Sequence, residues 1–129
     1  MKAKILVVDD ELDILSALQS VLEMEDYEVI SAINGKEGLK KFQENRPDLV
    51  LTDIMMPVLD GHGLINAIRN DLKDALVPII VLSAGALLSK QTNPGWNKFF
   101  SKPPDIELML STIAELIKKN KRFNAHASA

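Results

Sequence analysis

The sequence predicts an α/β fold in which five parallel strands form a doubly wound sheet covered by helices on both faces. Short apolar runs without alternation recur along the chain, as in strands buried on both faces. Stretches with apolar residues at helical spacing separate these runs. With 129 residues, the chain is long enough for one domain and one sizeable core. Strands that alternate with helices form βα units with right-handed crossovers, which gives the parallel sheet.

The first strand is predicted at Lys4 to Val8, where an apolar run ends in three acids. A helix follows from Leu12 to Met24, because its apolar residues repeat at the spacing of one helical face. Asp10 or Asp13 is a candidate for its N-cap. A brief second strand is predicted from Tyr27 to Ser31.

Asn34 is predicted to open a short second helix that must end before Pro47, because a residue before proline disfavours helical backbone. The third strand is the apolar run Leu49 to Leu51. After Gly63, a third helix carries an apolar stripe and ends near Lys73.

The fourth strand is predicted from Pro78 to Leu82. The segment Ala84 to Trp96 is predicted to hold a shortened fourth helix, because the turn residues Asn93 to Gly95 must break it. Lys98 to Ser101 forms the fifth strand, and a last amphipathic helix covers Asp105 to Asn120. Five strands favour the flavodoxin-like order 2-1-3-4-5.

The amino-acid composition argues against some classes of function. The balance of 15 basic and 18 acidic side chains, a net charge of −3, argues against a nucleic-acid-binding footprint over the whole domain. The chain has no cysteine, and no apolar stretch approaches the roughly 20 residues of a membrane span, so we expect a cytoplasmic protein with no membrane partner. Residues 1–122 are expected to form the domain, and residues 123–129 a disordered tail or a remnant of cloning.

Polar side chains follow four strands that the predicted order makes neighbours: Asp9, Asp10, Asp53, Ser83 and Lys102. Because parallel strands end at one edge of the sheet, these side chains should face one another. Crowded carboxylates repel unless a cation is present, and oxygen ligands without Cys or a nearby His fit Mg²⁺. Each residue alone has a simpler interpretation as a cap, a turn residue or a solvated lysine, so the prediction depends on their joint placement.

The same group of residues fits phosphoryl chemistry. Lys102 offers a positive charge and Ser83 a hydroxyl donor for phosphoryl oxygens. A carboxylate can act as nucleophile and form an acyl phosphate. Asp53, on the central strand, is the natural acceptor, whereas Asp9 and Asp10 are better placed to hold the metal.

Four sequence blocks in order carry a resemblance to a known family: Val7-Val8-Asp9-Asp10-Glu11, Asp53-Ile54-Met55-Met56-Pro57 with Asp60-Gly61, Ser83-Ala84, and Lys102-Pro103. Over Lys4 to Lys119 the sequence resembles the receiver domains of two-component response regulators, including the single-domain chemotaxis type. The resemblance implies that Asp53 accepts a phosphoryl group from a histidine kinase or a histidine phosphotransfer protein. It implies a Mg²⁺ site formed by Asp9, Asp10, Asp53 and Met55. It also implies a phosphate-binding site formed by Ser83, Ala84 and Lys102.

The resemblance also implies a conformational switch, in which Ser83 moves towards the phosphate and the aromatic Phe99 turns inward. Phe99 has an alternative interpretation as a plain core residue beside Phe100. The Lys102-Pro103 peptide is expected to be cis, at Pro103. Between Ser83 and Lys102 the chain is shorter than is usual in the family, which puts the usual partner geometry in question.

Two other function classes remain open. An aspartate-nucleophile phosphatase of the haloacid dehalogenase kind needs a second Asp two residues after the nucleophile, where this chain has Met55. An interaction domain with a receiver fold and an inactive site is disfavoured by the complete acid set and Lys102. We therefore expect a phosphoacceptor, capable of self-phosphorylation and slow self-dephosphorylation at most, rather than an enzyme. It acts alone or within a longer protein with its own output domain or effector.

Overall fold

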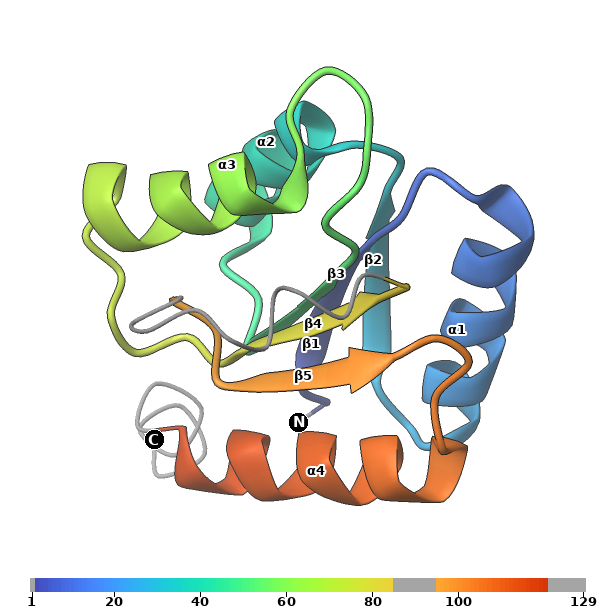
Figure 1. Cartoon of the computed structure of the whole chain (residues 1–129). Coiled ribbons are helices and arrows are strands. Elements are labelled where there is room, and N and C mark those ends of the chain that lie inside the picture. Colours follow the sequence, from blue (N-terminus) through green and yellow to red (C-terminus); the bar gives the residue numbers. More distant parts are fainter. Residues whose placement is uncertain (1, 85–94, 121–129) are drawn as a thin grey trace.

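The computed structural model describes residues 2–84 and 95–120. Within them lies one sheet of five parallel strands in the order β2-β1-β3-β4-β5, which confirms the predicted fold class and strand order (Figure 1). The strands are β1 (Lys4–Val8), β2 (Glu28–Ala32), β3 (Leu49–Thr52), β4 (Ile79–Ser83) and β5 (Lys98–Ser101).

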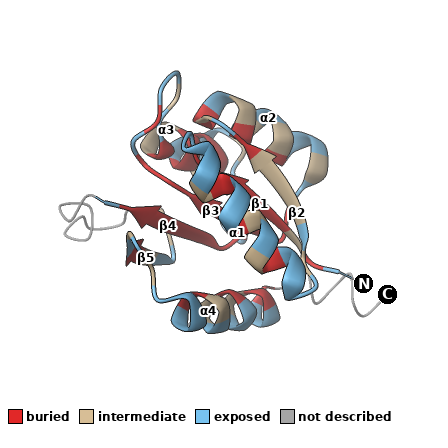
Figure 2. Cartoon of the chain, turned by 90° about the vertical axis from the view of Figure 1, so that its right-hand side faces the viewer, coloured by how far each residue is buried: buried red, intermediate tan, exposed pale blue. Residues whose placement is uncertain are grey.

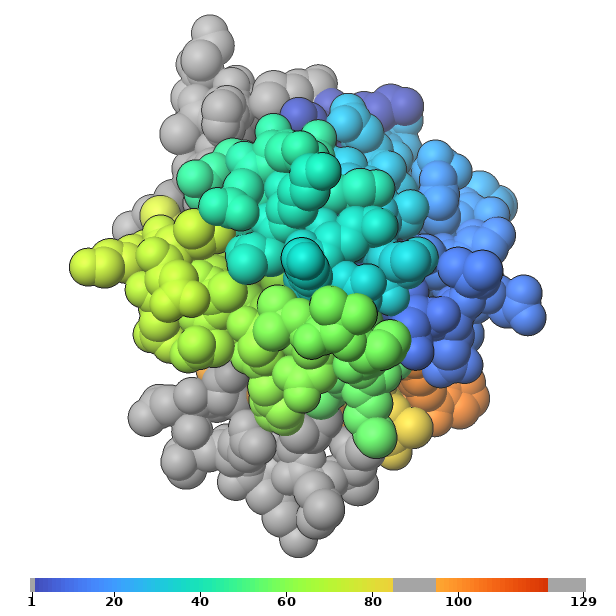
Figure 3. Space-filling view, turned by 90° about the horizontal axis from the view of Figure 1, so that it is seen from above, coloured from blue at the N-terminus to red at the C-terminus, as the bar shows by residue number. Residues whose placement is uncertain are grey.

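Helices cover both faces of the sheet. The described helices are α1 (Leu12–Met24), α2 (Gly35–Asn45), α3 (Gly61–Asn66), which continues into the π-helical turn η1 (Ala67–Asp71), and α4 (Ile106–Lys119). In Figure 1, α2 and α3 lie above the sheet, and α1 and α4 lie on its other face. The view from above shows α2 beside α3 and the loop after β3, with α1 next to that loop (Figure 3).

Each face of the sheet has its own hydrophobic core. Along β4, Ile80 and Leu82 pack with α1 and α4, whereas Ile79 and Val81 pack with α2 and α3. All five residues of β4 are buried (Figure 2). Burial on both faces explains why β1, β3 and β4 appear in the sequence as continuous apolar runs. Burying one such side chain contributes about 1.5–3 kcal/mol, so the strands anchor the whole fold.

Two predictions about the first βα unit were wrong in detail. The N-cap of α1 is Glu11, not Asp10 or Asp13, and within the described residues its side chain makes no capping bond. The second strand begins one residue later than predicted, because the Tyr27 N–H bonds to the Leu22 carbonyl at the end of α1. Tyr27 therefore belongs to the turn.

The third helix begins at Gly61, three residues before the predicted start at Leu64. Asp60 caps it, because its Oδ1 accepts the Gly63 N–H at 2.9 Å. The helix then widens into the π-turn η1, where the Leu72 N–H bonds to the Ala67 carbonyl, and Lys73 with φ 55° ends it. The sequence pattern did not indicate this π-turn.

The last helix agrees with the prediction within one residue at each end. Asp105 caps it by accepting the Leu108 N–H at 3.0 Å. None of the described helices has the length and apolar character needed to cross a bilayer. The predicted fourth helix falls largely on residues 85–94, and the predicted tail on residues 123–129; both lie outside the described residues.

Candidate functional site

The carboxyl ends of the strands bring the predicted residues to one edge of the sheet. Val8 of β1 pairs with Thr52 of β3, so the residues that follow them, Asp9 and Asp53, lie side by side. Ser83 of β4 pairs with Ser101 of β5, and the Lys102 N–H bonds to the Ser83 carbonyl at 3.1 Å. The sheet register therefore sets the relative positions of these side chains.

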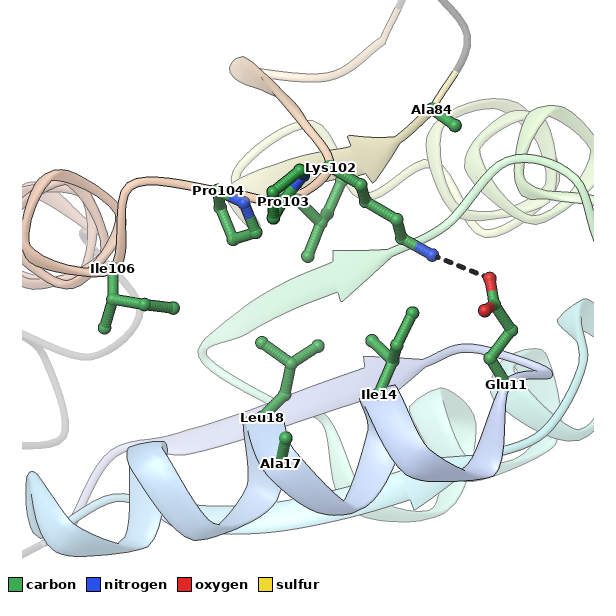
Figure 4. Close-up of a pocket in the computed structure, with 10 residues that line it drawn as sticks. Glu11, Ile14, Ala17, Leu18, Ala84, Lys102, Pro103, Pro104 and Ile106 are labelled. Atoms are coloured by element: carbon green, nitrogen blue, oxygen red, sulfur yellow. Dashed lines mark hydrogen bonds and ion pairs between the residues drawn. The ribbon is translucent and has the colours of Figure 1, made fainter.

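Lys102 connects the acids. Its Nζ donates to Oδ2 of Asp9 and to Oδ2 of Asp53, both at 2.9 Å. A third, longer contact of 3.4 Å reaches Oε1 of Glu11 (Figure 4). One ammonium group thus bridges carboxylates from the ends of two neighbouring strands.

The bridge is nearly excluded from water. Asp9 is 2% exposed, Asp53 is 6% exposed and the Lys102 side chain is 13% exposed. Burial raises the pKa of the Asp9 carboxyl, against the opposing effects of the Glu11 N–H and of Lys102. Burial also acts to lower the pKa of Lys102, but its hydrogen bonds to Asp53 and Asp9 and their charges outweigh burial and raise that pKa. Lys102 therefore stays cationic.

Backbone hydrogen bonds fix both buried carboxylates. Oδ1 of Asp53 accepts the Ile54 N–H at 2.6 Å, and Oδ1 of Asp9 accepts the Glu11 N–H at 2.9 Å. The loop after Asp53 is closed by a bond of 2.8 Å from the Gly61 N–H to the Ile54 carbonyl. A nucleophilic or ligating carboxylate needs this kind of fixed orientation.

Four acids gather at this edge. Carboxylate oxygens of Asp9, Asp10, Glu11 and Asp53 lie within 4.8 Å of one another. Asp10 and Glu11 are exposed, so the cluster opens to water on their side. An all-oxygen donor set with concentrated negative charge fits Mg²⁺. Glu11 was not predicted from the sequence to belong to this cluster, although it directly follows Asp9 and Asp10.

The remaining predicted residues surround the cluster. Ser83 is buried at the end of β4, whereas the next residue, Ala84, is exposed to solvent. Met55 is 76% exposed and borders an open cleft of about 420 Å³ that Asp10 also lines. The Lys102–Pro103 peptide is cis, the isomer that the resemblance implies.

The two adjacent phenylalanines of β5 point to opposite faces. Phe100 is 8% exposed and belongs to the core on the side of α1 and α4. Phe99 is half-buried on the side of α2 and α3, where its ring centroid lies 6.3 Å from that of Trp96. Phe99 is therefore the less tightly enclosed of the two.

A second cavity, of about 470 Å³, adjoins the acidic cluster. It runs between α1 and the chain after β5, and its walls are mostly apolar (Figure 4). Glu11 and Lys102 lie at one end, where the dashed contact joins them, and Ile106 lies at the other.

Known sequences similar to this chain belong to one kind of regulatory protein. A family model described as the response regulator receiver domain matches residues 5–114. The transcriptional regulatory protein PrrA of Mycobacterium bovis is 34% identical over 119 residues, which cover 90% of this chain and 50% of PrrA. A probable transcriptional regulator, ycf27 of Cyanophora paradoxa, is 48% identical over 83 residues, which cover 64% of this chain and 34% of ycf27. The chain thus spans a third to a half of these relatives.

Solved structures agree along nearly their whole length. The chemotaxis response regulator CheY4 of Vibrio cholerae superposes with a TM-score of 0.81 at 30% identity, covering 90% of this chain and 99% of that one. A CheY-like response regulator receiver domain protein from Methanospirillum hungatei gives a TM-score of 0.85 at 29% identity, covering 95% of this chain and 98% of that one. On sequence and fold together, this chain belongs to the receiver domain family of two-component response regulators.

Proposed function

We propose that the chain is a phosphoacceptor switch in which Asp53 takes a phosphoryl group from a phosphohistidine on a histidine kinase or a histidine phosphotransfer protein. Receiver domains generally serve as such acceptors. The observation that carries the proposal for this chain is the bridge from Lys102 to Asp53 and Asp9, at 2.9 Å to each.

The bond changes of the transfer are simple. A carboxylate oxygen of Asp53 attacks the phosphorus, the new O–P bond forms as the N–P bond breaks, and the donor imidazole leaves and takes up a proton from solvent. Phosphoryl transfer depends mainly on positioning and on neutralising the charge of the equatorial oxygens. The Ile54 N–H holds the carboxylate of Asp53 in place, and the Lys102 ammonium supplies a positive charge beside it.

Mg²⁺, when bound, neutralises charge on the acids and on the phosphoryl oxygens. The residues that would hold it are Asp9, Asp10, Asp53 and the backbone carbonyl of Met55. The crowding of acidic oxygens within 4.8 Å supports this assignment, since such a group is stabilised by a divalent cation.

The phosphoryl oxygens would be bound by Ser83, Ala84 and Lys102. Ser83 ends β4 between the strands that carry Asp53 and Lys102, which supports its role. Phe99 is the proposed switch aromatic, coupled to movement of Ser83, and its half-buried position beside Trp96 leaves it less restrained than Phe100. Self-phosphorylation and slow self-dephosphorylation would be the only catalysis of the chain.

A labelling experiment on wild type and an Asp53 variant tests the proposal. The protein is incubated with Mg²⁺ and a small acyl phosphate, and the intact mass is measured. Wild type should gain one phosphoryl group and Asp53→Asn none. Asp60→Asn is the matched control, because Asp60 lies on the same loop, caps α3 and should leave labelling unchanged. A wild type that gains no group, or an Asp53→Asn variant labelled equally well, would contradict the proposal.

A further inference from the structure

Arg69 connects the π-turn to the chain that leads into β5. Its Nε donates to the Gly95 carbonyl at 2.8 Å, and one terminal nitrogen donates to Oδ1 of Asn97 at 3.1 Å. The other terminal nitrogen donates to the Asp74 carbonyl at 2.9 Å, just beyond η1. One guanidinium group thus holds together two segments that are 26 residues apart in sequence.

Asn97 extends this connection into the sheet. Its Oδ1 also accepts the Ile79 N–H at 2.8 Å, and its own N–H donates to the Ile79 carbonyl at 2.7 Å. The contacts of Arg69 therefore reach the first residue of β4 as well as the start of β5. Burial lowers the pKa of Arg69, while the charge of Asp74 opposes that effect; the guanidinium still remains charged at neutral pH.

Gly95 allows the two segments to approach closely. Its φ is +86°, a conformation that residues with a side chain rarely adopt. A Cβ atom added there would lie 2.6 Å from Cγ2 of Ile65 on α3. Both the backbone conformation and the space require glycine at this position.

Aromatic contacts continue from the same place to Phe99. The Trp96 ring centroid lies 6.3 Å from the His62 ring on α3 and 6.3 Å from the Phe99 ring on β5. Centroid separations in this range are typical of interacting aromatic pairs. The helix α3, the segment that Arg69 holds and the half-buried aromatic of β5 are therefore in continuous contact.

We propose that Arg69 is a positioning residue that holds the start of β5, and with it Phe99, in the arrangement that accompanies an unmodified Asp53. This inference rests on the proposed function. Lys102 follows β5 directly and bonds to the free Asp53 carboxylate, so the contacts of Arg69 with Gly95 and Asn97 accompany an unmodified site.

The proposal predicts the direction of coupling. Contacts that stabilise only the unmodified arrangement oppose the modified one by the same free energy. Removing the bonds from Arg69 to Gly95 and Asn97 should therefore favour the modified arrangement. Coupling between sites typically changes affinity by about 5- to 150-fold, so we expect a gain of about fivefold or more in affinity for a phosphoryl analogue.

The experiment measures beryllofluoride binding in the presence of Mg²⁺ by calorimetry. Trp96, the only tryptophan of the sequence, gives a fluorescence signal in parallel. Arg69→Met should bind about fivefold or more tightly than wild type, and Arg69→Lys, which keeps the charge but loses the forked geometry, should lie between them. Gly95→Ala should shift the affinity in the same direction without changing Arg69.

Lys41→Met is the matched control. The Nζ of Lys41 on α2 donates to the Ser31 carbonyl at 2.8 Å, so this variant also loses a half-buried contact between a cation and a carbonyl, but far from β5. It should lower the free energy of unfolding while leaving beryllofluoride affinity unchanged, which separates positioning from general stability.

The outcomes distinguish the two proposals. If wild type binds beryllofluoride through Asp53 but Arg69→Met binds with equal or lower affinity, the positioning role is refuted and the proposed function stands. If wild type binds no beryllofluoride, or Asp53→Asn binds it equally well, the proposed function fails and the positioning role fails with it.

Discussion

Replacing Lys102 by methionine should leave two buried carboxylates facing each other without a cation. Methionine keeps an unbranched chain of similar length, so the change removes mainly the charge and its donors. Removing one partner from a buried ion pair typically costs about 3–5 kcal/mol. Because the cluster opens to water beside Asp10 and Glu11, we expect a value near the lower limit, about 3 kcal/mol of unfolding free energy.

A double-mutant cycle identifies the source of this loss. In the Lys102→Met background, Asp53→Asn removes one of the two unpaired charges and should recover most of the lost stability. In the wild-type background, the same substitution removes the charge of one of the two carboxylates that Lys102 contacts at 2.9 Å. It should therefore not stabilise the protein to the same extent. Urea unfolding in chelator-treated buffer measures all four proteins. Added Mg²⁺ should reduce the deficit of Lys102→Met, because a ligand that binds only the folded state stabilises it.

Lys119→Met provides the comparison. Lys119 contacts Glu115 at 2.8 Å, a distance like those in the cluster, but their side chains are 70% and 63% exposed. Exposed pairs contribute about 0–1 kcal/mol. Equal losses in Lys102→Met and Lys119→Met, or no recovery from Asp53→Asn, would show that the cluster behaves as a solvated ion pair, and the reasoning from burial would be refuted.

Three further outcomes are expected. Asp9→Asn should raise the free energy of unfolding at neutral pH, as measured by urea titration without Mg²⁺. The pKa of Asp9 is higher in the folded than in the unfolded protein, so ionisation of Asp9 destabilises the fold as the pH rises between these two pKa values. Below both pKa values Asp9 is protonated in either state, so the stability gained by the substitution should vanish there. Gly61→Ala should destabilise far more than Gly63→Ala in thermal unfolding, because the new Cβ meets the rigid Asp53 carbonyl in the first case and a flexible leucine side chain in the second. Asn120→Ala should cost about 1–2 kcal/mol in urea unfolding, because the buried Asn120 amide donates to a backbone carbonyl at 2.8 Å.

The strands β1, β3 and β4 could be predicted from the sequence because a strand buried on both faces consists of consecutive apolar residues. The ends of elements could not be predicted where hydrogen bonds of the turns decide them. Tyr27 was expected to begin the second strand, but its N–H bonds to the Leu22 carbonyl of α1. Asp60 caps α3 before the apolar stripe of that helix begins. The π-turn was not predictable either. A turn of five residues is too short for periodicity to distinguish the two kinds of helix.

The candidate site, like the fold, could be predicted from the sequence only in part. Asp9, Asp53 and Lys102 could be brought together because each directly follows a strand of predictable order. The contact of Glu11 depends on a side chain reaching back from the first turn of α1, which no spacing rule indicates. The role inferred for Arg69 depends on one guanidinium reaching across 26 residues, and the sequence gives that pairing no signal.

The acidic edge is a position where stability and function conflict. Burial raises the pKa of Asp9, so the ionised carboxylate disfavours folding even beside Lys102. The same burial strengthens the interactions among the charges of Asp9, Asp53 and Lys102. Lys102 balances the carboxylates only while Asp53 is free, and a phosphoryl group on Asp53 would compete for that ammonium. In the proposed switch, a phosphoryl group on Asp53 would therefore alter the contacts of Lys102 at the end of β5, the strand that also carries Phe99.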